Sequence, residues 1–208
     1  MTQPTILLFL KAPRKGLVKT RLAKSIGDRG ALGAYRNLVS KQIAEFDPSW
    51  PLNIHYTPVD AQAEMSDWLG SARSFIVQES GDLGKRLSAA INQHFQNQTG
   101  PVFLLGADCP WLNSVILKKA SRAAVLSDVV IGPTHDGGYY LLGLNQNHPG
   151  LFEDIKWSSE EVFGQTIERA EGLGLSVASL PTLHDVDNLH EWTLAQNTFP
   201  ELSVSEHK

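Results

Sequence analysis

The sequence predicts an α/β protein with a mixed, mostly parallel sheet, because apolar runs typical of strands alternate with helical patterns along most of the chain. Alternating strands and helices require crossover connections, which make the strands parallel. The apolar runs 129–133 and 139–144 depart from this pattern, since only a short segment containing Asp136-Gly-Gly138 separates them. Such a short connection forces an antiparallel or sharply bent pair, so we expect a mixed sheet.

The expected strands share apolar, β-prone sequences and are Thr5–Leu10, Leu52–Thr57, Ser74–Gln78, Val102–Gly106, Asp128–Pro133, Tyr139–Leu144 and Leu175–Leu180. The expected helices show helical periodicity and are Arg29–Phe46, Ala61–Leu69, Leu83–Gln96, Ser114–Leu126 and Ser159–Gly172. A further helix begins at Lys19, and another follows the segment 184–188. No linker or internal repeat divides the chain, so we expect one domain over residues 1–200 and a flexible tail over residues 201–208.

The composition describes an ordinary soluble globular protein, with 42% hydrophobic and 19% charged residues. No apolar run approaches the ~20 residues that cross a membrane. The single cysteine, Cys109, excludes an internal disulfide and a cysteine-rich zinc site. A net charge of -4 with one basic cluster argues against nucleic-acid binding. We therefore expect a cytoplasmic protein without membrane or nucleic-acid partners, and no particular oligomeric state is predicted.

A cationic loop follows the first predicted strand. The segment Lys11–Lys24 holds six of the 18 Lys and Arg residues and no acid. Solvated charge is the usual explanation of such a run, but ligands of open α/β sheets bind beyond the carboxyl ends of strands, where this loop would lie. Pro13 restrains the turn beside Ala12, Gly16 permits close approach of the backbone, and the helix N-terminus at Lys19 favours an anion. The loop therefore predicts phosphate binding, although it matches neither the Walker A pattern nor G-x-G-x-x-G.

Three aspartates follow strand-like segments and precede helices. Asp108 lies two residues after the run Val102–Gly106, and Asp185 and Asp187 lie in the segment 184–188. A helix cap or turn is the alternative role for Asp108 and Asp187. Two carboxylates ~4 Å apart repel by about 4 kcal/mol at an effective dielectric near ~20, and a divalent cation would reverse that repulsion. Because all-oxygen ligands select such ions, we expect a Mg²⁺ or Mn²⁺ site.

Two glycine-bearing loops are further candidates, Glu79–Gly84 and the turn formed by Asp136, Gly137 and Gly138. Turn chemistry alone explains both sequences. Successive glycines also clear side chains from a surface where a substrate could lie, so we expect the second loop to contact a substrate. Other catalytic patterns are lacking, since the sequence has no G-x-S-x-G and no H-E-x-x-H, and Cys109 lies beside a carboxylate that disfavours its thiolate.

Five motifs occur in order along the chain: K-A-P-x-x-G-x-x-K-T-R-L from Lys11, G-D-L-G-x-R from Gly81, G-A-D-C-P from Gly106, D-G-G-Y-Y-L-L-G-L from Asp136 and D-V-D from Asp185. From Ile6 to about Trp192, the chain resembles the glycosyltransferase-A-like radical-SAM/selenodomain-associated transferases of the nucleotide-diphospho-sugar transferase superfamily. The resemblance implies a single-domain Rossmann-like α/β/α sandwich of glycosyltransferase-A type that binds a nucleotide through Mg²⁺. The K-T-R-L and D-V-D elements are also similar to those of 2-phospho-lactate guanylyltransferases.

The resemblance implies a role for each motif. The residues that would hold nucleotide phosphates are Lys11, Lys19 and Arg21, within the loop that includes Ala12, Pro13 and Gly16. The residues that would lie against base or ribose are Gly81, Asp82, Leu83 and Gly84. Asp108 with Asp187, or with Asp185, would hold the metal. Asp136, Gly137 and Gly138 would face the acceptor.

The leading functional hypothesis is a Mg²⁺-dependent nucleotidyltransferase that joins a nucleotide monophosphate from a nucleoside triphosphate to a small phosphorylated acceptor. Lys19 and Arg21 would neutralise the leaving pyrophosphate, and a metal on Asp108 would bridge phosphate oxygens. The alternative is a glycosyltransferase with a nucleotide-diphospho-sugar donor, because the D-x-D motif frequent in that superfamily is reduced here to Asp108. A third hypothesis is a non-catalytic nucleotide-binding protein.

Overall fold

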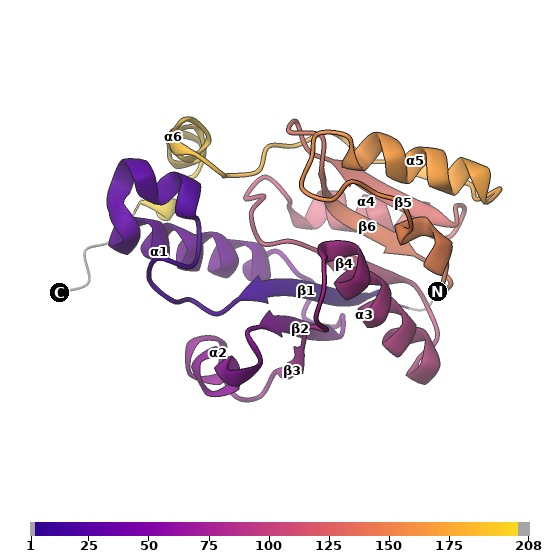
Figure 1. Ribbon diagram of the computed structural model, residues 1–208, viewed down its shortest axis with the longest axis horizontal. Coiled ribbons are helices and arrows are strands. Elements are labelled where there is room, and N and C mark those ends of the chain that lie inside the picture. The colour runs from indigo at the N-terminus through magenta and orange to yellow at the C-terminus, as the bar shows by residue number, and fades with distance from the viewer. Residues whose placement is uncertain (1–2, 204–208) are drawn as a thin grey trace.

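The computed structural model describes residues 3–203 and shows a seven-stranded sheet covered by helices on both faces (Figure 1). The strands are β1 (Thr5–Lys11), β2 (Leu52–Thr57), β3 (Ser74–Val77), β4 (Val102–Leu105), β5 (Val129–Pro133), β6 (Tyr139–Leu144) and β7 (Val177–Ser179). They lie in the order β3-β2-β1-β4-β6-β5-β7. Only β6 runs antiparallel, to both β4 and β5. The predicted α/β fold with a mixed, mostly parallel sheet is confirmed, including the antiparallel pair.

The helices are α1 (Thr20–Ala44), α2 (Gln62–Leu69), α3 (Leu83–Asn97), α4 (Ser114–Ala123), α5 (Val162–Gly172) and α6 (Leu189–Thr198). Short 3₁₀ turns lie at η1 (Val59–Ala61), η2 (Pro149–Phe152) and η3 (Pro200–Leu202). The two helical segments expected before and after residue 27 are both present and join into α1 across a kink at Gly27, whose φ of 73° is not helical. The expected helices therefore match the observed ones, apart from differences of a few residues at their ends.

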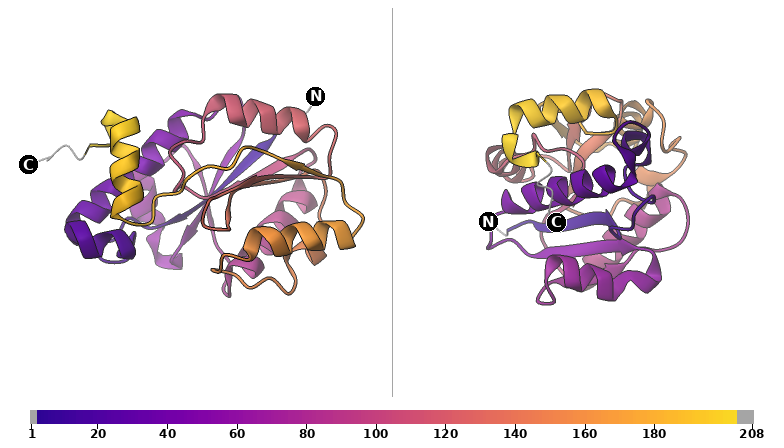
Figure 2. Two further views of the ribbon diagram at one scale, coloured as in Figure 1. Left: turned by 90° about the horizontal axis from the view of Figure 1, so that it is seen from above. Right: turned by 90° about the vertical axis from the view of Figure 1, so that its left-hand side faces the viewer.

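Apolar side chains from both faces of the sheet build the core. Ile6 and Leu8 of β1 pack in a cluster that includes α1, α2 and α4, whereas Leu7 packs in a second cluster with α3 and α5. A central strand buried on both faces reads as a continuous apolar run, which explains the sequence of β1. A smaller cluster joins α6 to α1, and Figure 2 shows these helices side by side.

The flexible tail was expected to begin at residue 201, but Leu202 is 1% exposed and packs with Leu38 and Trp192. The folded body therefore extends at least through η3, because an apolar side chain that fills a gap between α1 and α6 is stabilised there. The rest of the expected tail, residues 204–208, lies outside the described residues. Within residues 3–203, no helix combines the length and apolar character required to cross a membrane.

A histidine lies inside the core between the sheet and α3. His55 of β2 is 3% exposed, its ring stacks on Phe9 with centroids 5.0 Å apart, and its Nε2 has no hydrogen-bond partner within residues 3–203. Burial, followed by the charge of the neighbouring His94, lowers the pKa of His55 from 6.5 to about 4. The folded protein therefore holds this imidazole neutral in mildly acidic solution, where the unfolded chain protonates it.

Acid should destabilise the protein through His55. The unfolded chain binds the proton below 6.5 and the folded chain only below about 4, so stability is full above this window and falls as the pH drops through it. Between about pH 7.5 and about pH 5, this group should lower the free energy of unfolding by about 2 kcal/mol. Urea unfolding should show that the free energy of unfolding of His55→Phe falls by about 2 kcal/mol less than that of the wild type over this pH range. The exposed control His190→Asn should lose as much as the wild type. Equal acid sensitivity of His55→Phe and wild type would contradict this.

Candidate active site

The candidate site lies where the order of strands reverses, between β1 and β4. A cavity of about 500 Å³ occupies this edge, at the carboxyl ends of β1 and β2 and beside the start of α1. Its charged lining residues are Lys11, Lys19, Arg21, Arg86, Asp108 and Asp187. Such a switch point is where open α/β sheets bind ligands, so the cavity is the candidate site.

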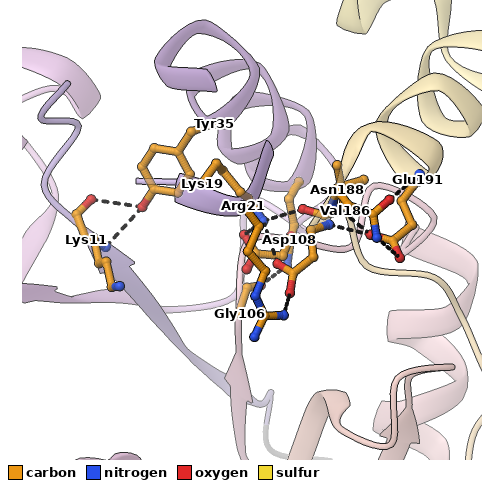
Figure 3. A network of polar contacts seen from close by, with 11 residues as sticks. Lys11, Lys19, Arg21, Tyr35, Gly106, Asp108, Val186, Asn188 and Glu191 are labelled. Atoms are coloured by element: carbon orange, nitrogen blue, oxygen red, sulfur yellow. Dashed lines mark hydrogen bonds and ion pairs between the residues drawn. The ribbon is translucent and has the colours of Figure 1, made fainter. Parts of the chain in front are cut away.

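The Lys19 ammonium lies at the centre of this site (Figure 3). Its Nζ is 2.6 Å from Asp108 Oδ1 and 3.8 Å from Asp187 Oδ1, and it donates a hydrogen bond to the Val186 carbonyl at 2.6 Å. The side chain is only 5% exposed. Lys19 also has a left-handed backbone with φ of 47°, a conformation that costs roughly 1–3 kcal/mol in a residue other than glycine. The ion pairs stabilise this conformation and bring the amine between the two carboxylates.

The two carboxylates are held by different neighbours. The Val186 N–H donates to the Asp108 carbonyl at 2.9 Å, which ties the segment before α6 to the end of β4. Asp187 Oδ2 accepts a hydrogen bond from Arg21 at 2.8 Å. Asn188, not Asp187, caps α6, and Asn113, not Asp108, caps α4. The capping role considered for these aspartates is therefore wrong, and both carboxylates pair instead with cations that line the cavity.

Within residues 3–203, Asp185 forms no ion pair with Lys19, and its expected place in the metal set stays a prediction. It faces a second cavity of about 140 Å³, which shares Gly106 and Asp108 with the first. Asp187 lines the first cavity and Asp185 the second, so the two carboxylates of this segment contact different cavities. Burial raises the pKa of Asp185 to about 7, with smaller contributions from Asp136 and other acids. Residues 3–203 contain no group of three His, Cys, Asp or Glu side chains that could hold a metal.

Most of the cationic loop positions the cavity instead of lining it. Lys11 lines the cavity, and the Tyr35 hydroxyl fixes its backbone through hydrogen bonds to the N–H and carbonyl at 3.0 and 2.9 Å. Ala12 and Pro13 are buried and lie outside the lining, as does Gly16, whose φ of 79° forms the turn. These three residues therefore shape the loop.

Three of the six cations of the segment Lys11–Lys24 do not line the cavity, namely Arg14, Lys15 and Lys24. Arg14 forms a two-point ion pair with Glu64 of α2, with its Nε and Nη2 at 2.9 and 2.7 Å from Oε1. Lys15 is exposed and outside the lining. Only part of the positive charge in this loop therefore faces a ligand.

The G-D-L-G-x-R motif provides a different residue from those expected. Asp82 caps α3 by accepting from the Lys85 N–H at 2.9 Å, and a Cβ at Gly84 would lie 2.2 Å from Trp157 Nε1. Gly81, Asp82 and Gly84 therefore shape the turn and its packing. Of the four residues expected to contact base or ribose, only Leu83 lines the cavity. Arg86, the last residue of the motif, lines it as well.

Further lining residues were missed. They include Tyr35, Thr57 and Gln78. Arg86 could have been predicted as a ligand contact, because it is the last residue of the G-D-L-G-x-R motif. Tyr35 lies within a helical pattern that gives no indication of a ligand, and Gln78 directly follows a strand. These residues converge through tertiary structure alone.

The Asp136–Gly138 turn borders the second cavity. Asp136 Oδ1 accepts hydrogen bonds from the Thr134 hydroxyl at 2.5 Å and from the Gly138 N–H at 3.0 Å, and both Asp136 and Gly138 line the cavity. Gly137 does not line it. Its φ is 87°, and an added Cβ would lie 2.0 Å from the Glu160 carbonyl oxygen, so Gly137 permits the approach of the loop before α5.

Cys109 forms part of the wall of the second cavity but is only 2% exposed. Burial raises the pKa of its thiol to about 12. A thiol that stays protonated is a poor nucleophile, which agrees with the sequence-based argument against covalent catalysis by this residue.

Replacement of Gly137 by alanine should destabilise the fold. Strain at positive φ and the clash with Glu160 should together lower stability by about 3 kcal/mol, which corresponds to a melting temperature about 6–12 °C lower. Gly164→Ala in α5 is the matched control, because its Cβ would meet no atom within 4 Å. Differential scanning calorimetry measures both, and an unchanged melting temperature for Gly137→Ala would contradict the packing role.

Comparisons with known proteins agree with this architecture. A structure from Desulfovibrio desulfuricans G20, described as a "putative nucleotide-diphospho-sugar transferase", is 33% identical, with 99% of this chain and 90% of that chain covered and a TM-score of 0.88. It supports the expected superfamily. No curated protein matches the chain in sequence. The resemblance to the radical-SAM/selenodomain-associated transferases and to 2-phospho-lactate guanylyltransferases stays a prediction.

More distant structures share the fold alone. The 4-diphosphocytidyl-2C-methyl-D-erythritol synthase of Anaerococcus prevotii DSM 20548 is 10% identical, with 95% and 96% of the two chains covered and a TM-score of 0.63. Rv0371c of Mycobacterium tuberculosis H37Rv, in complex with manganese, is 13% identical, with 95% and 100% covered and a TM-score of 0.57. The model of the family "Uncharacterized protein conserved in bacteria (DUF2064)" matches residues 42–159, more than half of the chain. The chain therefore belongs to the DUF2064 family.

Proposed function

We propose that this protein is a divalent-metal-dependent nucleotidyltransferase that uses a nucleoside triphosphate and releases pyrophosphate. The observation that carries the proposal is the gathering of four cations, Lys11, Lys19, Arg21 and Arg86, around one cavity at the start of α1. Several cations and a helix N-terminus stabilise a polyphosphate. A triphosphate carries more negative charge than a diphosphate ester, so four cations favour a triphosphate donor.

The residues at the centre of the site fit a divalent metal. Two carboxylates and the Val186 carbonyl surround a single position, which the Lys19 ammonium takes. This donor set is all oxygen, and Mg²⁺ or Mn²⁺ accepts one or two carboxylates and completes its shell with water and phosphate. Asp108 and Asp187 would hold the ion, which when bound supplies positive charge against the phosphate oxygens. The distant structure of Rv0371c with manganese supports a metal in this fold.

Lys19 has two possible sets of partners. In the structure it neutralises Asp108 and Asp187, and the same amine lies in the wall of the nucleotide cavity. A bound polyphosphate would draw Lys19 to its own oxygens and release the carboxylates. Lys19 and Arg21 would then neutralise the departing pyrophosphate, while Lys11 and Arg86 orient the nucleotide. We expect this chemistry in the cytoplasm.

Glycosyl transfer from a nucleotide-diphospho-sugar is the second candidate. The name of the Desulfovibrio desulfuricans structure, 33% identical, favours it. So does the second cavity, whose lining within residues 3–203 contains no lysine or arginine to bind the phosphorylated acceptor expected from the sequence. A non-catalytic nucleotide-binding protein is disfavoured, because Asp108 and Asp187 keep the pair of carboxylates that metal chemistry requires.

Nucleotide binding should be visible as thermal stabilisation. In Mg²⁺ or Mn²⁺, a nucleoside triphosphate at 100 times its Kd should add about 2.7 kcal/mol and raise the melting temperature by about 5–11 °C. Arg86→Met should weaken binding by about tenfold, as expected for a charge-assisted phosphate contact, while the exposed control Lys15→Met should bind like the wild type. The proposal fails if no triphosphate stabilises the protein. Stronger stabilisation by nucleotide sugars would favour the glycosyltransferase.

The metal assignment is tested separately at Asp108. Asp108→Asn keeps the shape of the side chain but removes the charge, so the part of the nucleotide-induced shift that depends on Mn²⁺ should disappear. Asp185→Asn removes a carboxylate that faces the other cavity, and its Mn²⁺-dependent shift should be retained. A full Mn²⁺-dependent shift in Asp108→Asn would show that the metal lies elsewhere.

A further inference from the structure

We propose that Ser158 contacts the nucleotide donor directly and hydrogen-bonds an oxygen of its ribose-triphosphate portion. This inference rests on the proposed nucleotidyl transfer and adds a donor-binding residue to it. Ser158 lies in the segment before α5 and lines the cavity of about 500 Å³, whereas Lys11, Lys19 and Arg21 line it from the end of β1 and the start of α1. The cavity therefore has walls from both halves of the chain.

The backbone of Ser158 is left-handed, with φ of 65°. Within residues 3–203, the residues other than glycine that have a positive φ are Lys19, Asp154 and Ser158, and both Lys19 and Ser158 line the cavity. This conformation is unfavourable for a residue with a Cβ, whereas glycine adopts it without that cost. Strained residues of this kind cluster at ligand sites, so the backbone of Ser158 points to a contact in the cavity.

Internal contacts explain the other two left-handed residues but not Ser158. The Lys19 ammonium pairs with Asp108, and the Asp154 carboxylate pairs with Arg169. The Ser158 side chain is exposed in the wall of the cavity and forms no hydrogen bond with another residue of the range 3–203. Water can satisfy this hydroxyl in the free protein, but water does not offset the backbone strain, which glycine would avoid. A contact between the hydroxyl and a ligand gives the side chain a role at this position.

The neighbours of Ser158 in the chain hold it at the cavity. Trp157 packs against Gly84, and the Glu160 carbonyl packs against Gly137, so closely that a Cβ at either glycine would overlap its neighbour. The first turn of α3, which contains Gly84, also lines the cavity. Ser158 is therefore placed by packing on both sides and not by its own side chain. A hydroxyl placed before the ligand binds loses little freedom on binding, which favours affinity.

The chemistry of a hydroxyl defines the part of the donor that it contacts. Serine can donate a hydrogen bond to a phosphate oxygen, or exchange hydrogen bonds with a ribose hydroxyl. Both oxygens belong to the portion that all nucleoside triphosphates share. The contact should therefore strengthen binding whichever base the donor carries.

The test compares two adjacent serines by calorimetric titration with ATP, GTP, CTP and UTP in Mn²⁺. Ser158→Ala should bind the tightest of the four about fivefold to tenfold more weakly, with little change in melting temperature. The Ser159 hydroxyl instead donates to the Lys156 carbonyl at 2.7 Å and accepts from the Glu161 N–H at 3.3 Å. Ser159→Ala should therefore melt about 2–4 °C lower and bind like the wild type. Wild-type affinity in Ser158→Ala, or equal weakening in both variants, would overturn the proposal.

Ser158→Gly tests the strain itself. It should raise the melting temperature by about 2 °C, because glycine relieves the left-handed backbone, and it should bind nucleotide as weakly as Ser158→Ala. A lower melting temperature for Ser158→Gly would contradict the strain from which the proposal starts.

Titration with inorganic tripolyphosphate identifies the contacted oxygen. A loss in Ser158→Ala as large as that for the nucleotide assigns the contact to phosphate, and a loss confined to the nucleotide assigns it to ribose. If the wild type binds a nucleotide and Ser158→Ala binds it equally well, this inference alone fails. If the wild type binds none of the four triphosphates, the nucleotidyl-transfer proposal fails as well.

Discussion

The ion pairs of Lys19 are the interaction on which the rest of the site depends. The amine, buried to 5% exposure, contacts Asp108 after β4 and Asp187 before α6, while its own backbone begins α1. Three segments far apart in the sequence therefore meet at one positive charge (Figure 3). A buried amine is tolerated only when it is paired, and two carboxylates repel without a cation between them. Lys19 thus holds together the start of α1, the end of β4 and the segment before α6.

Asp108 lies at the boundary between two cavities of opposite character. One cavity is lined by cations and the start of α1, and the other by carboxylates and the turn after β5. This asymmetry favours a polyphosphate in the first cavity, because the lysine and arginine side chains that line the two cavities within residues 3–203 all belong to it. The antiparallel strand β6 contributes to it, since its start places Gly138 and the Tyr140 ring against the second cavity. The antiparallel strand that makes the sheet mixed therefore also helps to form the cavity lined by carboxylates.

The sequence was sufficient for much of the fold and for part of the site. The antiparallel β5–β6 pair followed from its short connection, and Lys19, Arg21 and Asp108 followed from loops at strand ends. The divergence of Asp185 and Asp187 could not be predicted, because the intervening Val186 is fixed by hydrogen bonds to Asp108 and Lys19. Likewise, local patterns do not show that Gly84 and Gly137 pack against Trp157 and Glu160, which are distant in sequence. Contacts between separate segments, which periodicity does not encode, decide these positions.

The most direct measurement is the affinity of Mn²⁺ for the nucleotide-free protein. If the Lys19 ammonium takes the position of the divalent cation, Lys19→Met leaves Asp108 without a cation, leaves Asp187 paired with Arg21 alone, and opens that position. Calorimetric titration should then show Mn²⁺ binding to Lys19→Met at least about tenfold tighter than to the wild type, with the exposed control Lys24→Met unchanged. Equal or weaker Mn²⁺ binding by Lys19→Met would contradict a metal site between Asp108 and Asp187.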